Sequence, residues 1–295
     1  MEPFAAVARE IASLSGAPCA PAPQQSVAGG SINACYRWQG AGGAMFVKIA
    51  ACAAASIFEA EAAGLAELDR ARAVRVPRVL ACGHTDSAAF IALEWIETAR
   101  AGGECERRLG EGLAALHAVT APRYGWVRDN SIGRTPQANG WMSGWAEFFR
   151  ERRLRPQLSL ALQNGFGDVL GARGERLLES LPQLLQGHAP APSLLHGDLW
   201  GGNWLATRSG EPVFFDPAVY YGDRETDIAM TRLFGGFGER FYRAYEAAAP
   251  PAAGAQLRGE LYNLYHVLNH ANLFAGGYPR QARAIIDRLL AEIGG

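Results

Sequence analysis

The chain has 295 residues, 49% hydrophobic and 19% charged, a composition typical of a globular protein large enough for two lobes. Its formal net charge of −1 gives no electrostatic reason to expect nucleic acid or a membrane surface as a partner. No apolar run approaches the roughly 18 residues of a membrane-spanning helix. The five cysteines form no Cys-x-x-Cys pair, which argues against a zinc site or a disulfide framework and predicts a reducing, cytoplasmic location.

The first 96 residues predict a small lobe built on an antiparallel sheet. Residues 2–13 mix charged and apolar side chains and predict an amphipathic helix, not a signal peptide. Five short apolar or alternating segments follow, bounded by glycine and proline, as in strands. The expected strands cover 26–30, 33–38, 44–49, 79–82 and 88–95, and a helix with apolar residues at helical spacing covers 56–70.

From about residue 97 the pattern becomes mostly helical. Two short strands, over 203–207 and 212–216, flank a turn at Ser209 and Gly210. Helices are expected over 104–119, 141–163 (interrupted at Pro156), 168–186, 225–234, 258–274 and 279–293. We therefore predict an α+β, two-lobed, protein-kinase-like fold, with a nucleotide-binding lobe over 1–96 and a catalytic, substrate-binding lobe over 97–295.

The strongest chemical signal lies between residues 195 and 218. Asp198 and Asn203 are five residues apart, as in the H-R-D-L-x-x-x-N loop of protein kinases, and Asp216 follows in the place of the D-F-G aspartate. Phosphoryl transfer needs positioning, a carboxylate near the attacking hydroxyl and a cation on the phosphates. We expect Asp198 to be that carboxylate, and Asn203 and Asp216 to offer the oxygen ligands that suit Mg²⁺.

Lys48 is the only lysine of a chain whose other basic residues are all arginine. It lies in an apolar segment with strand character that resembles the V-A-I-K strand, whose lysine holds nucleotide phosphates. The alternative is a surface lysine left by chance. Glu59 or Glu61 of the following helix is a candidate acidic partner, and the two point in different directions because they are two residues apart.

A glycine-rich turn, 29–33, lies between the first two expected strands. Backbone N–H groups of Gly29, Gly30, Ser31 and Asn33 are candidates to cover ATP phosphates, although a hairpin with two glycines is common. Cys35 follows this turn and is either a redox-sensitive thiol or, more simply, a small passive side chain.

Three further features have both a structural and a functional interpretation. We expect His196 to brace the loop that carries Asp198 through hydrogen bonds. Asp227, in the first turn of a helix, has two compatible interpretations: it complements the helix dipole, and it anchors the backbone of that loop. A cluster of arginines forms either a solvated helix face or a contact to an anionic group; its members are Arg150, Arg152, Arg153 and Arg155.

Taken together, these segments resemble the fructosamine kinase (ketosamine-3-kinase) family over residues 5–292. The resemblance rests on residues 29–33, 46–48, 135–141, 148–158, 196–203 and 216–225. It implies an ATP- and Mg²⁺-dependent kinase that phosphorylates the C3 hydroxyl of a sugar joined to an amine, on a small molecule or a glycated protein lysine. Asp223 departs from the pattern, because a histidine is common there, and this could alter substrate preference.

Carried over residue by residue, the resemblance implies a role for each motif. It makes Asp198 the base, Asn203 and Asp216 the Mg²⁺ ligands, Lys48 the phosphate contact and Glu61 the partner of Lys48. ATP would lie between the lobes, with its adenine bonded to backbone at Glu94, Trp95 and Ile96. The alternatives are another small-molecule kinase, such as an aminoglycoside phosphotransferase, and a non-catalytic nucleotide-binding scaffold. A protein kinase fits least, because D-F-G and A-P-E are both missing.

Overall fold

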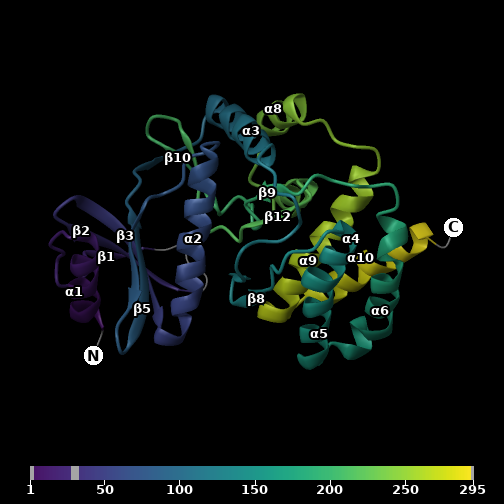
Figure 1. Cartoon of the computed structure of the whole chain (residues 1–295), viewed down its shortest axis with the longest axis horizontal. Coiled ribbons are helices and arrows are strands. Elements are labelled where there is room, and N and C mark those ends of the chain that lie inside the picture. The colour runs from purple at the N-terminus through teal and green to yellow at the C-terminus, as the bar shows by residue number, and fades with distance from the viewer. Residues whose placement is uncertain (1–2, 28–32, 294–295) are drawn as a thin grey trace.

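Figure 1 shows the computed structural model, which describes residues 3–27 and 33–293. Its N-terminal part is a five-stranded sheet of order β1-β2-β3-β5-β4, in which every neighbouring pair is antiparallel. This confirms the predicted α+β fold and its sheet. The elements are α1 (Phe4–Ser15), β1 (Gln25–Ser26), β2 (Ala34–Gly40), β3 (Gly43–Ala51), α2 (Ala55–Ala71), β4 (Val79–His84) and β5 (Ala88–Glu94).

Helices α1 and α2 cover opposite faces of this sheet (Figure 1). Strand β5 contributes side chains to both faces of the sheet. Residues 88–93 are all buried, and successive side chains alternate between the two hydrophobic cores. Phe90 shares a core with Val7 of α1, whereas Ile91 shares the other core with Leu65 of α2. A continuous apolar run is therefore what a strand covered on both sides requires.

The C-terminal part is mostly helical, with three small sheets. Helix α9 contacts α5, α7 and α10, and α3 contacts α8. No helix in the described ranges is both long and apolar enough to cross a membrane. The elements are β6 (Thr98–Ala99), α3 (Gly103–His117), β7 (Asn130–Ile132), β8 (Thr135–Gln137), α4 (Trp145–Phe149), α5 (Arg155–Gln163), α6 (Gly167–Leu184), β9 (Ser193–Leu195), β10 (Trp204–Thr207), β11 (Pro212–Phe214), β12 (Tyr220–Gly222), α7 (Glu225–Leu233), α8 (Glu239–Ala248), α9 (Ala255–Phe274) and α10 (Tyr278–Ile293).

The segment predicted as one helix over 141–163 differs in two respects. It begins later, at Trp145, and one π-helical turn, Arg150–Leu154, joins α4 to α5. Pro156 does not interrupt the helix, because it lies in the first turn of α5, directly after the π turn.

Two short strand pairs bring the predicted site residues together. Strand β9 leads directly into His196, and its antiparallel partner β12 follows Asp216. The β10–β11 hairpin has Asn203 before its first strand and Asp216 after its second. The ends of that hairpin lie side by side, because the Phe215 N–H donates to the Asn203 carbonyl oxygen at 3.1 Å.

Candidate active site

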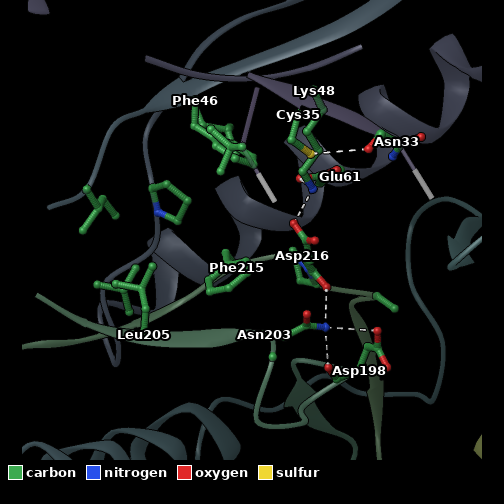
Figure 2. Close-up of a pocket in the computed structure, with 18 of the residues that line it drawn as sticks. Asn33, Cys35, Phe46, Lys48, Glu61, Asp198, Asn203, Leu205, Phe215 and Asp216 are labelled. Carbon is green, nitrogen blue, oxygen red and sulfur yellow. Dashed lines mark hydrogen bonds and ion pairs between the residues drawn. The ribbon is translucent and has the colours of Figure 1, made fainter. Parts of the chain in front are cut away.

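A cavity of about 560 Å³ is lined by residues of the sheet, of α2 and of the loops after β9 and β11. Its size is in the range of small-molecule sites. Figure 2 shows its polar centre, where Lys48 and Glu61 meet Asp216, Asn203 and Asp198. The predicted residues that line it are Asn33, Lys48, Glu61, Glu94, Trp95, Ile96, Asp198, Asn203 and Asp216. Gly29, Gly30 and Ser31 lie outside the described residues.

Lys48 projects from β3 on the side of the sheet that α2 covers, and only 5% of it is exposed. Its Nζ lies 2.8 Å from Oε1 of Glu61 and also contacts the Asp216 carboxylate (Figure 2). Burial alone would lower the pKa of Lys48, but the two carboxylates outweigh it and raise that pKa. The pairing distinguishes Glu61 from Glu59, whose carboxylate lies 3.8 Å from Arg128 instead. Lys48 is therefore a fixed, buried cation and not a surface residue.

Asp198 lies at the opposite side of this centre, in the loop after β9. The Asn203 amide donates to the Asp198 backbone oxygen at 2.8 Å and to its carboxylate at 3.1 Å. Burial, with the nearby charge of Asp216, raises the pKa of Asp198 to about 7. A carboxylate with a near-neutral pKa is well matched to accepting a proton at physiological pH.

The loop that carries Asp198 is held by buried hydrogen bonds. Asp227 of α7 accepts from the backbone N–H of His196 at 2.8 Å and of Gly197 at 2.9 Å, which confirms its predicted anchoring role. The His196 ring donates from Nε2 to the Phe215 carbonyl at 3.0 Å and accepts the Asp198 N–H at Nδ1. Burial lowers the pKa of His196, so the ring stays neutral and braces the loop as expected.

The backbone at Gly197 leaves no room for a side chain. Its φ is +82°, and an added Cβ would lie 2.1 Å from the Ala218 carbonyl oxygen. Asp216 also has a positive φ, +54°, which is uncommon for a residue with a Cβ. Outliers of this kind concentrate at functional sites, and here the conformation turns the Asp216 carboxylate toward Lys48.

The residues around Asp216 fit a hard divalent cation. The side chain of Asp216 is 39% exposed, and its charge adds to that of the neighbouring Asp198. Asn203 uses its amide nitrogen for hydrogen bonds to Asp198, which leaves its side-chain oxygen to act as a ligand. The Asp216 carboxylate and the Asn203 side-chain oxygen are ligands of the kind that Mg²⁺ prefers.

Away from the polar centre, the cavity wall is mostly apolar and is formed by segments far apart in sequence. The charged residue of this wall, Glu94, is neutralised by pairing with Arg75 at 2.7 Å and Arg78 at 2.8 Å. These arginines outweigh the burial of Glu94 and lower its pKa. The Trp95 ring lies 5.0 Å from the Arg37 guanidinium. Wall residues that the sequence did not indicate include Val27, Phe46, Leu93, Leu205, Val213 and Phe215.

The β7–β8 hairpin also reaches the cavity, which the sequence did not indicate. Asn130 and Ser131 of β7 and Gly133 of its turn line the cavity, and the Asn130 amide donates to the Val219 carbonyl at 2.8 Å. Gln137 holds the same segment through the Ala218 carbonyl at 3.2 Å. The only sequence signal was the fragment 135–141 among the family-like segments.

Other candidates lie away from this centre. Cys35 lines the cavity, but burial raises the pKa of its thiol, which favours the passive interpretation. Arg150 and Arg155 both pair with Glu151. Arg153 is fully buried with its guanidinium 3.9 Å from the Tyr220 ring centre. None of the four clustered arginines is among the described residues that line the cavity, so an anion contact there is not supported.

Asp223 is also remote from the cavity lining. It is 1% exposed and accepts hydrogen bonds from His188 Nε2 and the Tyr262 hydroxyl, each at 2.6 Å. Glu225 lies close to this group but is paired with Arg258 at 2.7 Å. Asp223 therefore joins α9, β12 and α7, and makes no direct contact that would select a substrate.

Comparison with known proteins first shows a shared fold. A crystal structure of aminoglycoside phosphotransferase APH(4)-Ia, in ternary complex with AMP-PNP and hygromycin B, aligns with a TM-score of 0.63 at 16% identity and covers 97% of this chain and 98% of that one. At this identity the likeness concerns the fold alone. It places the chain in the class of proteins with the protein-kinase-like fold.

The family follows from closer matches. The model of the family described as "Fructosamine kinase" matches residues 3–292. A "Probable ketoamine kinase" of Synechocystis sp. is 42% identical over 98% of this chain and 97% of its own length. The chloroplastic protein-ribulosamine 3-kinase of Arabidopsis thaliana is 41% identical over 90% of this chain and 82% of its own.

A solved structure supports the same assignment. The Thermobifida fusca protein, crystallised as a candidate fructosamine-3-kinase, aligns with a TM-score of 0.84 at 33% identity, over 97% of this chain and 98% of that one. The chain belongs to the fructosamine kinase family. It is an ATP-dependent phosphotransferase that acts on a hydroxyl group.

Proposed function

We propose that this kinase transfers the ATP γ-phosphoryl group to the C3 hydroxyl of ketosamines, whether fructosamines, ribulosamines or erythrulosamines. The acceptor is a sugar on a small amine or on a protein lysine, and phosphorylation there begins deglycation. The observation that carries the proposal is the half-buried Asp198, with its pKa raised to about 7, held in a cavity shared with Lys48 and Asp216. The names of the ketoamine and ribulosamine kinase relatives supply the acceptor class.

Each residue of the site has one task in this proposal. Asp198 orients the acceptor hydroxyl and accepts its proton as transfer proceeds. Lys48, fixed by Glu61, contacts the ATP phosphates, and the 29–33 turn covers them. Asn203 and Asp216 hold Mg²⁺, which neutralises the phosphate charge when bound.

We propose further that the adenine lies against the apolar wall and bonds to backbone between Glu94 and Ile96. We also propose that the two lobes meet between residues 96 and 97. This boundary places β6, which pairs with β10, in the catalytic lobe. The five cysteines are free, which agrees with the proposed reducing, cytoplasmic location.

The test is ADP release from ATP·Mg²⁺ with fructosyl-, ribulosyl- and erythrulosyl-lysine as separate acceptors. We expect turnover on at least one, and loss of it by roughly 10²- to 10⁴-fold in Asp198→Asn. Asp86→Asn, at an exposed position, is the matched control and should match the parent enzyme. ATP binding without turnover on any acceptor would instead support another acceptor or a non-catalytic scaffold.

A further inference from the structure

A run of aromatic rings leads from the cavity onto the protein surface. Trp200, two residues after Asp198, lines the cavity and is 40% exposed. Its ring centre lies 6.5 Å from that of Phe234, which lies 4.7 Å from that of His270. Phe274, at the end of α9, follows at 5.6 Å from His270. We call these four side chains the aromatic run.

The aromatic run is fixed to the loop that carries Asp198. Phe234 precedes Gly235 and Gly236, and these two glycines pack against the backbone of Gly201. An added Cβ on Gly236 would lie 2.6 Å from the Gly201 Cα, so the two loops touch without intervening side chains. Anything that leaves the cavity past Trp200 therefore meets Phe234 next.

Three of the four rings are exposed, and no arginine of the described residues stacks on them. Phe234 is 38% and Phe274 53% exposed, and His270 between them is half-buried. The described arginines that stack on aromatic rings do so on other rings, such as Trp95, Trp141 and Tyr242. The faces of the aromatic run are thus available to an ammonium group, which aromatic faces attract.

The size of this surface favours a small occupant over a second copy of the chain. The exposed parts of Trp200, Phe234 and Phe274 amount to roughly 260 Å² if a full side chain counts about 200 Å². A stable protein interface needs about 800 Å² on each partner. A single alkyl chain with a few neighbouring groups is matched to the smaller area.

We propose that the aromatic run binds the alkylammonium arm on which the ketosamine is carried. This inference rests on the proposed function, because the amine of a ketosamine is a protonated secondary amine beside the sugar. The sugar enters the cavity, and the arm leaves it over Trp200 and Phe234. The ammonium then lies beside Trp200. A peptide continues beyond its lysine side chain toward Phe274, whereas an arm as short as glycine ends before it. The enzyme therefore favours ketosamines on peptide lysines over those on short amines.

The experiment compares two acceptors with the same sugar, ribulosyl-glycine and a short peptide with one ribulosyl-lysine. Phe274→Ala should raise KM for the peptide about three- to tenfold with kcat unchanged, as expected for the loss of one partly exposed apolar contact. KM for ribulosyl-glycine should stay within about twofold. Leu162→Ala, at an aliphatic side chain 42% exposed on α5, is the matched control.

Other outcomes overturn the inference in distinguishable ways. An equal loss on both acceptors, or no loss on either, would show that Phe274 does not contact the arm. A change of oligomeric state in Phe274→Ala, without selective loss, would assign the surface to a second copy. Absence of Asp198-dependent turnover on both acceptors would overturn the proposed function and this inference together, whereas turnover without carrier preference would overturn the inference alone.

Discussion

Replacing Asp227 by asparagine should weaken the fold and the active site together. Its carboxylate accepts two backbone N–H groups, of His196 and Gly197, and lies 3.2 Å from His117 Nε2. Hydrogen bonds to a charged acceptor contribute about 1.5–3 kcal/mol each. Asparagine keeps one acceptor at reduced strength and turns an N–H toward the other donor. We expect the free energy of unfolding to fall by about 2–4 kcal/mol, out of a total of about 5–15 kcal/mol.

Urea denaturation measures this loss, and its pH dependence gives a second readout. His117, His196 and the Gly197 N–H outweigh the burial of Asp227 and lower its pKa in the folded state. A lowered pKa stabilises the fold above the unfolded value of about 3.9, and that contribution disappears as pH falls through the folded pKa. The difference between the parent and Asp227→Asn should therefore shrink below about pH 4.

Asp287→Asn is the control for both measurements. Asp287 is 39% exposed and pairs with Arg173 and Arg283 on the surface, where such pairs contribute about 1 kcal/mol or less. The kcat of Asp227→Asn should also fall, because the loop that positions Asp198 loses its anchor. A stability loss no larger than that of Asp287→Asn, with unchanged kcat, would refute the anchoring argument.

Three further predictions concern the cavity itself. Lys48→Arg should lower kcat/KM for ATP by roughly 10²-fold, since a planar fork does not replace a compact cation between Glu61 and Asp216; steady-state kinetics near the parent values would contradict this. Gly197→Ala should abolish most activity, because the added Cβ would clash with the Ala218 carbonyl oxygen. Gly210→Ala should retain activity: Gly210 also has a positive φ, +76°, but an added Cβ there meets open space. Burial raises the pKa of Asp198 to about 7, and the base must be deprotonated to act. The kcat/KM for the acceptor should therefore fall about tenfold per pH unit below pH 7. A flat pH profile down to about pH 5 would argue against Asp198 as the base.

The sequence was sufficient where local chemistry decides the structure. The spacing of Asp198 and Asn203 is a property of one short loop, and Lys48 follows from its place in an apolar strand. Helix periodicity gave α2 and α9 with ends within a few residues of those observed. The glycine-rich turn stays a prediction, because its residues lie outside those described.

Tertiary contacts decided what the sequence did not show. Strands β9 and β12 have three residues each and exist because they pair with each other across the loop at Asp198. The β7–β8 hairpin is equally short, and its place at the cavity depends on contacts with α2 and the backbone at Val219. Helix α8 was missed because only Phe241 and Tyr245 of its ten residues are buried.

The burial of Lys48 has a consequence for the chemistry of the enzyme's own surface. Reducing sugars condense with unprotonated primary amines, and lysine side chains are the usual sites of this damage. Here the only lysine is 5% exposed and is kept protonated by its two carboxylate partners. The surface therefore presents arginines but no lysine ε-amino group. An enzyme proposed to act on sugar-modified amines therefore has almost no side-chain amine of its own that a reducing sugar can modify.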